Sequence, residues 1–250
     1  MNVLVNFSLY GTNPLYSVGA VRNAELYARL RPEWGLRFYT GLAIASDTRE
    51  DILKANPRAE IIEVGEPENA AATWWRCRVI FEPPPDTALL FRDTDSRPCD
   101  RELAAVDEWL RQDELYAHAI RDHQWHCAAM LAGLWGIKAP GIYPVSKRIP
   151  MSVQDIWTTD QLELQASVFP VVRRHLMSHL GSSCIYEKPS QRRPLRIPRP
   201  LGGFVGQGFK ADETPRFPHH VTEELLLTDE YLMSRDDVFL PQYRASHAER

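Results

Sequence analysis

Short apolar runs alternate with segments of helical spacing along the first ninety residues of the chain. The apolar runs predict four strands, over Asn2–Leu9, Gly35–Thr40, Glu60–Val64 and Thr87–Arg92. The segments between them predict three helices, over Ala20–Leu30, about Asp47–Ala55 and Ala70–Ile80, with a loop over 10–18 before the first. Strands that alternate with helices in this way are typical of an α/β fold that binds a nucleotide.

The pattern after residue 95 is less regular. It predicts a helix from Asp100 to about Arg111, a strand over Leu115–Ile120, a helix from Thr159 to about Leu176 that Pro170 bends or ends, and a short strand within 175–185. Proline-rich residues 189–218 are predicted to form an irregular loop that wraps the surface. Residues 221–233 have helical spacing, and 234–250 are expected to be a loose tail.

Composition narrows the class of protein. The chain has 250 residues, a net charge of -4 and 44% apolar residues, which argues against a nucleic-acid binder driven by phosphate contacts. No apolar run is long enough to predict a transmembrane segment. The N-terminus does not resemble a signal peptide, and the four cysteines form no Cys-x-x-Cys pair, so we expect reduced thiols and a cytoplasmic location.

Asp93 and Asp95 lie where the apolar strand 87–92 ends. Residues two apart in an extended chain point to the same side, so both carboxylates can face one point. A divalent cation that holds a diphosphate would neutralise such a pair. The alternative is a surface turn in which the two aspartates pair with Arg92 and Arg97.

Several motifs occur in a fixed order. They are Asn-Phe-Ser-Leu-Tyr-Gly at 6–11, Arg-Asp-Thr-Asp-Ser-Arg at 92–97, Arg-Asp-His at 121–123, a small-residue segment at 128–135, Asp-Gln at 160–161 and Phe-Val-Gly-Gln at 204–207. In this order they resemble the Asp-x-Asp-containing GT-A type of nucleotide-sugar glycosyltransferase. The resemblance is to glycogenin-like families and to small bacterial proteins associated with surface-polysaccharide loci.

The resemblance implies a GT-A-like single domain, with a Rossmann-like mixed sheet flanked by helices, over residues 1–220. Residues 1–112 would bind the nucleotide, 113–220 would form the acceptor side, and 221–250 would be a C-terminal helix and tail. The implied activity is transfer of a sugar from a UDP- or GDP-linked donor to a saccharide or related acceptor, with Mn²⁺ or Mg²⁺ as cofactor. The implied biological role is in surface polysaccharide synthesis.

The resemblance also assigns candidate residues. Asp95 is expected to bind the metal directly, and Asp93 is expected to bind it through water or to hold the ribose of the nucleotide. His179 is the candidate third ligand, although Leu180-Gly181 replaces the acidic residue expected after it. Asp122 is the candidate general base or sugar ligand, and Asp160 is expected under the donor sugar. The candidate donor-binding residues are Asn6, Tyr10, Arg22, Arg76, Asp93, Gly133 and Gln161.

Four of the candidates have a structural alternative: His179 as an ordinary buried histidine, Asp160 as a helix cap, and Arg22 or Arg76 as a surface charge. A zinc site at 123–127 is disfavoured by its spacing. Other functions also stay open at this point. They are an Asp-x-Asp phosphatase or phosphotransferase, a nucleotidyltransferase, and a catalytically inactive saccharide-binding relative.

Overall fold

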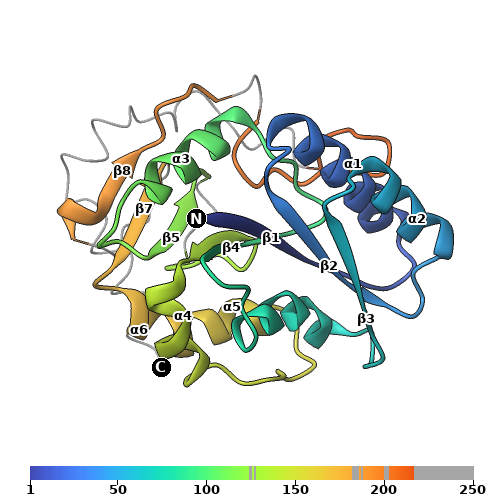
Figure 1. The fold of residues 1–250 in the computed structure, drawn as a ribbon, viewed down its shortest axis with the longest axis horizontal. Helices are drawn as coiled ribbons and strands as arrows, with labels where there is room; N and C mark the ends of the chain where they lie inside the picture. The colour runs from blue at the N-terminus through green and yellow to red at the C-terminus, as the bar shows by residue number, and fades with distance from the viewer. Residues whose placement is uncertain (124–125, 127, 182–185, 187, 200–202, 217–250) are drawn as a thin grey trace.

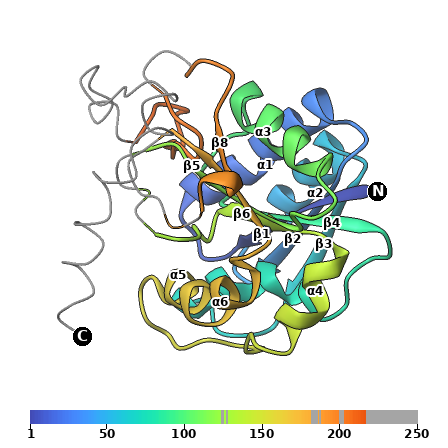
Figure 2. The same ribbon diagram turned by 90° about the vertical axis from the view of Figure 1, so that its left-hand side faces the viewer.

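The computed structural model describes residues 1–123, 126, 128–181, 186, 188–199 and 203–216. One eight-stranded sheet with the order β3-β2-β1-β4-β6-β5-β7-β8 runs through the molecule (Figure 1). Helices α1, α2 and α3 cover one face of the sheet, and α4, α5 and α6 cover the other (Figure 2). The predicted helix at 221–233 and the tail lie outside the described residues.

The first half is a parallel sheet. Its strands are β1 (Asn2–Leu9), β2 (Gly35–Gly41), β3 (Ala59–Val64) and β4 (Thr87–Arg92), connected by α1 (Pro14–Leu30), α2 (Ser46–Ala55) and the 3₁₀ helix η1 (Ala70–Ile80). The four strands and three helices predicted for this region are confirmed. The predicted loop is wrong from residue 14, because Pro14 starts α1 and the Asn13 side chain caps it by accepting a hydrogen bond from the Leu15 amide at 3.0 Å.

The second half inserts an antiparallel strand. Its elements are α3 (Asp100–Leu110), β5 (Ala117–Arg121), β6 (Leu134–Ile137), α4 (Ala139–Ser146), α5 (Thr159–Glu163), the π-helical turn η2 (Leu164–Val168), α6 (Phe169–Val172), β7 (Leu176–Leu180), the 3₁₀ turn η3 (Pro189–Gln191) and β8 (Arg192–Pro194). Strand β6 pairs antiparallel with both β4 and β5. The predicted helix from Thr159 is interrupted by a π-helical turn directly before α6, and it ends at Val172 instead of near Leu176, which begins β7.

Three elements were not expected from the sequence pattern: the short strands β6 and β8 and helix α4. Strand β6 has four residues that are buried on both faces, so it lacks the alternation that identifies a strand. Gly136 lets it approach β4, because a Cβ there would lie 2.8 Å from Leu90 Cδ2. Strand β8 contradicts the predicted irregular loop, and its Pro194 is tolerated because β8 is an edge strand.

The core follows the alternation of side chains along the central strands. Ala88 and Leu90 of β4 join the cluster on the side of α1 and α3, whereas Leu89 and Phe91 join the cluster with η1 and α4. Because β4 is buried on both faces, its carboxyl end is held rigidly at the edge of the sheet where the acidic motif follows.

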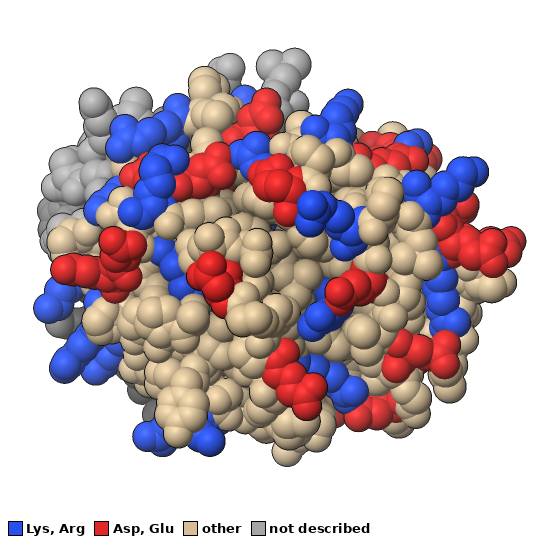
Figure 3. Space-filling model, in the orientation of Figure 1, with Lys and Arg blue, Asp and Glu red and all other residues tan. Residues whose placement is uncertain are grey.

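The surface is mixed in charge. On the face shown in Figure 3, basic and acidic side chains are interspersed around a broad uncharged area, and no field of one sign dominates it. Among the residues described, no helix combines the length and the apolar character that crossing a bilayer requires.

Candidate active site

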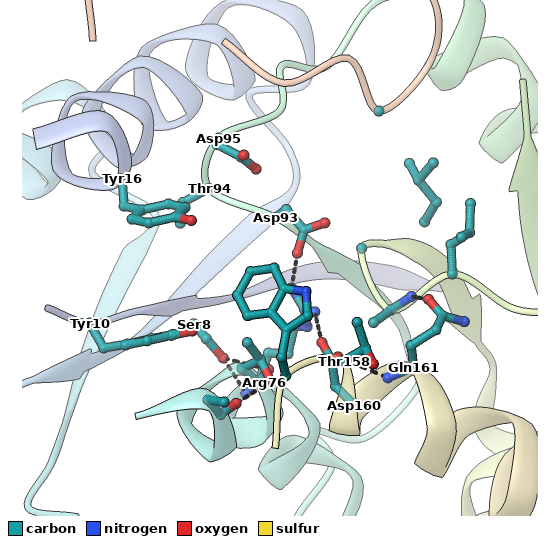
Figure 4. Close-up of a pocket in the computed structure, with 18 of the residues that line it drawn as sticks. Ser8, Tyr10, Tyr16, Arg76, Asp93, Thr94, Asp95, Thr158, Asp160 and Gln161 are labelled. Carbon is teal, nitrogen blue, oxygen red and sulfur yellow. Dashed lines mark hydrogen bonds and ion pairs between the residues drawn. The ribbon is translucent and has the colours of Figure 1, made fainter. Parts of the chain in front are cut away.

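A pocket of about 380 Å³ opens at the carboxyl ends of β1 and β4. The chain that follows β1 contributes Tyr10, and the chain that follows β4 contributes Asp93, Thr94 and Asp95. Helices η1 and α5 close the other side (Figure 4). Ligands in open α/β sheets bind at this edge of the strands, so the pocket is the expected place for chemistry.

Arg76 lies at the centre of the pocket and is only 3% exposed. Its guanidinium donates to Asp160 Oδ2 at 2.8 Å and forms an ion pair with Asp93 (Figure 4). Burial lowers the pKa of Arg76, but the two carboxylates raise it by more, so the side chain stays charged. The Arg76 amide also donates to Ser8 Oγ at 3.0 Å, which fixes η1 to the end of β1. One buried cation therefore positions two pocket carboxylates from different parts of the chain.

The surface-turn alternative for the acidic motif is wrong. Arg92 is buried and binds Glu102 at 2.5 Å, and Arg97 binds Glu213 at 2.7 Å. Both aspartates of the motif face the same pocket instead.

Asp93 and Asp95 form an oxygen donor set suited to a hard divalent cation. Burial raises the pKa of Asp95, the Asp93 charge raises it further, and Arg216 opposes both effects. Two carboxylates that destabilise one another in this way favour a shared cation. Within the described ranges, no group of three or more His, Cys, Asp or Glu side chains is placed to hold a metal. The pair by itself therefore supplies two carboxylates to a cation.

Gly133 provides the space that the Asp93 carboxylate occupies. A Cβ at this position would lie 1.9 Å from Asp93 Oδ2. The loop that carries Gly133 is held by Gln161, whose Oε1 accepts from the Ala132 amide at 3.1 Å. The backbone N–H of Gln161 in turn donates to Asp160 Oδ1 at 2.8 Å. Gly133 and Gln161 thus line the pocket and fix its carboxylates.

Gly133→Ala is expected to displace the Asp93 carboxylate and break its ion pair with Arg76, because an overlap at 1.9 Å cannot be relieved by a small shift. If the pocket binds a nucleotide as the sequence predicts, the affinity for that nucleotide should fall at least tenfold. Titration with a nucleoside diphosphate and Mn²⁺ measures this loss. Gly65→Ala is the matched control, since a Cβ there has no atom within 4 Å. Equal nucleotide affinity in both variants would show that Asp93 does not need this position.

Aromatic side chains form the remaining wall. Tyr10 packs edge-on against Trp75 with ring centroids 5.8 Å apart, and burial raises its pKa to about 12. Tyr16 of α1 also lines the pocket, and Trp157 lies at the pocket with 77% of its surface exposed. Thr158 has a left-handed backbone, with φ 68°, that turns the chain into α5. Flat surfaces of this kind suit a base or a sugar ring.

Four further residues line the pocket and were not expected there from the sequence: Ser8, Tyr16, Trp157 and Arg216. Tyr16 fell in a predicted loop, although Pro14 after Asn13 is a usable signal for a helix start. Trp157 and Arg216 belong to segments without a periodic pattern, so no local signal placed them.

Seven predicted site residues line the pocket and four do not. Those that do are Tyr10, Arg76, Asp93, Asp95, Gly133, Asp160 and Gln161. Asn6 is fully buried in β1, where its Nδ2 donates to the Leu4 and Leu90 carbonyls at 3.0 and 3.2 Å. Arg22 lies on the outer side of α1 and pairs with Glu25 at 2.6 Å. Both side chains have structural partners and do not line the pocket, so neither is placed to bind the donor there.

His179 is not a metal ligand in this arrangement. Its Nδ1 lies 2.8 Å from His118 Nε2, and its Nε2 lies 3.6 Å from Glu108 Oε2, away from the pocket. Burial lowers the pKa of His179 and of His118, so both imidazoles are neutral near pH 7. These contacts are those of an ordinary buried histidine. A zinc site at 123–127 is not tested, because Cys127 lies outside the described residues.

Asp122 is not placed to act as a general base. Its side chain is fully buried and outside the pocket, where Arg101 donates to both carboxylate oxygens at 3.0 Å. Arg199 lies 2.9 Å from Oδ1, and the Val205 amide donates to Oδ2 at 2.9 Å. Asp122 therefore joins β5, α3 and the segment at 195–205.

No family model matches the sequence, and no curated protein sequence does so either. Solved structures do match. A mannosyltransferase from Pyrobaculum calidifontis, solved with GDP-Man and Mn²⁺, has a TM-score of 0.51 at 13% identity, over 71% of this chain and 53% of its own. Glucosyl-3-phosphoglycerate synthase from Mycobacterium tuberculosis, solved with Mn²⁺, UDP-glucose and phosphoglyceric acid, has a TM-score of 0.48 at 11% identity, over 71% of this chain and 68% of its own.

The fold is a GT-A-like α/β fold, as predicted. Its structural neighbours are glycosyltransferases that bind a nucleotide sugar and a divalent metal.

Proposed function

We propose that this chain transfers a sugar from a nucleotide-sugar donor to a saccharide or related acceptor with the help of Mn²⁺ or Mg²⁺. The observation that supports the proposal is the pocket at the ends of β1 and β4, in which Asp93 and Asp95 face the same space as Asp160 and an aromatic wall. The GT-A-like fold supports this class of function for the pocket.

The two aspartates have the role of holding the cation. When bound, a divalent cation stabilises the charge that grows on a departing diphosphate. Asp93 is oriented by Arg76 and by the space at Gly133, so its carboxylate is preorganised rather than free to rotate. Preorganised charge costs little reorganisation during the reaction.

Asp160 is the carboxylate proposed to lie beside the donor sugar. Arg76 occupies its Oδ2 and the Gln161 amide occupies its Oδ1, each at 2.8 Å, and each oxygen keeps a second lone pair for a sugar hydroxyl. Tyr10, at the end of β1, is the proposed stacking surface for the base, and Trp157 is proposed to contact a sugar ring. A cytoplasmic location and a part in surface polysaccharide synthesis remain predictions.

A ligand screen tests the proposal. We expect UDP or GDP to stabilise the chain against thermal unfolding only when Mn²⁺ or Mg²⁺ is present, by about 2.7 kcal/mol at a nucleotide concentration one hundred times its dissociation constant. The matching nucleotide sugar should then release its nucleoside diphosphate in the presence of an acceptor.

Two other outcomes would replace the proposal. Stabilisation by orthophosphate analogues alone would favour the phosphatase or phosphotransferase alternative, in which an aspartate attacks phosphorus. Saccharide binding without turnover of any nucleotide sugar would favour a catalytically inactive relative.

A further inference from the structure

The segment that carries Arg216 is attached to the backbone of the acidic motif. The Phe209 amide donates to the Asp95 carbonyl at 2.8 Å, and Gly208 forms an antiparallel bridge with Ser96. The chain then turns back on itself, with a bridge between Phe209 and Pro215. The Arg216 amide donates to the Gly208 carbonyl at 2.9 Å and closes this turn. We call residues 208–216 the Arg216 loop.

The Arg216 loop places a guanidinium on a metal-binding candidate. Arg216 Nη1 donates to Asp95 Oδ2 at 2.6 Å, and both side chains line the pocket. Gly208 leaves the space for this contact, because a Cβ there would lie 3.2 Å from Arg216 Cδ and 3.4 Å from Asp95 Oδ2. Arg216 thus places a positive charge on the Asp95 oxygen that a metal cation could otherwise bind.

Backbone contacts and a second ion pair hold the Arg216 loop in addition to the contact between Arg216 and Asp95. The backbone bonds to Asp95 and Ser96 do not involve the Arg216 guanidinium. Glu213 provides a separate attachment through its 2.7 Å ion pair with Arg97. The Arg216 side chain is 34% exposed and lines the pocket, so a ligand in the pocket can reach its guanidinium.

We propose that Arg216 competes with the divalent cation for Asp95, and that the diphosphate of the donor relieves this competition by binding the released guanidinium. The inference rests on the proposed function. A cation that approaches Asp95 alone must break a charge-assisted hydrogen bond and lie beside another positive charge. A diphosphate offers oxygens to both cations, and the planar guanidinium matches phosphate geometry. Metal and nucleotide should therefore increase each other's affinity by the same factor.

Titration of the full chain with Mn²⁺, followed by electron paramagnetic resonance of the free ion, tests the competition without any turnover. In the absence of nucleotide, Arg216→Gln should bind Mn²⁺ about tenfold more tightly than the natural chain. With UDP or GDP added, the gain in Mn²⁺ affinity should be about tenfold smaller in the variant, within the ordinary range of such couplings. Lys210→Gln is the matched control, since Lys210 is an exposed cation of the same loop, and it should change neither value by more than twofold.

Mn²⁺ affinity that is equal or weaker in Arg216→Gln without nucleotide would overturn the proposal. Arg216→Lys keeps the charge but loses the fork, so it should give an intermediate affinity, and it replaces the glutamine variant if that variant does not fold. Asp95→Asn, tested alone and with Arg216→Gln, separates the two levels of inference. If it removes Mn²⁺ binding while Arg216→Gln has no effect, only the competition is wrong. If it leaves Mn²⁺ binding unchanged, the metal site itself is wrong and the competition with it.

Discussion

Asp95→Asn is expected to lower metal-dependent turnover of the nucleotide sugar by about 10³-fold, since stabilisation of a departing diphosphate by a bound cation contributes several kcal/mol. The amide is a much weaker ligand than the carboxylate, so the cation would lose one of the two oxygen donors that the pocket provides. Release of the nucleoside diphosphate at fixed Mn²⁺ concentration measures the effect.

The fold of this variant should be retained. The asparagine side-chain oxygen can still accept from Arg216, and the backbone bonds of Asp95 to the Arg216 loop are unchanged. Asp51→Asn, at an exposed position of α2, is the control for a simple loss of charge. Turnover at the natural rate in Asp95→Asn would show that the acidic pair does not carry the chemistry.

Asp122→Asn is expected to destabilise the chain by about 3–5 kcal/mol, because it leaves the buried Arg101 and the largely buried Arg199 without their shared negative partner. The Asp122 carboxylate is fully buried and accepts from both arginines and from the Val205 amide. An isosteric amide cannot accept on both of its terminal atoms, so at least one of these donors would lose its acceptor. The midpoint of urea unfolding measures the change.

The matched control for this variant is Asp107→Asn. Asp107 also pairs with an arginine, Arg31, at 2.6 Å, but its side chain is 40% exposed, so its loss should cost less than about 1 kcal/mol. The comparison also separates the two roles considered for Asp122. If Asp122 were a general base, Asp122→Asn would lower turnover and leave the stability unchanged. If Asp122 is a structural carboxylate, the variant loses stability first.

The motif Arg-Asp-His therefore has a structural explanation in its second residue. Asp122 joins the end of β5 to α3 and to the segment before Gly206, which lines the pocket. The charged motif at the end of β5 predicted a catalytic residue, but the Asp122 carboxylate instead holds the segment next to Gly206, which lines the pocket. Its effect on turnover is expected to be indirect.

The first half of the fold and the position of the acidic pair could be predicted from local sequence patterns alone. Strands β1 to β4 have apolar runs of ordinary length separated by helical segments, and both patterns arise from local spacing. Parallel strands end at the same edge of the sheet, so the residues after β1 and β4 had to lie near one another. Tyr10, Asp93 and Asp95 could be assigned to one site for this reason.

Which charged side chains contact one another became evident from the tertiary structure. Arg76 could have been a surface charge, and it became the buried centre of the site because η1 packs between β1 and α5. Asp122 and His179 have the residue types of a catalytic site, yet packing of α3 and of the chain after β8 surrounds both with other partners. Arg216 reaches Asp95 from 121 residues away in the sequence. Contacts of this kind depend on how whole elements pack, and no local periodicity encodes them.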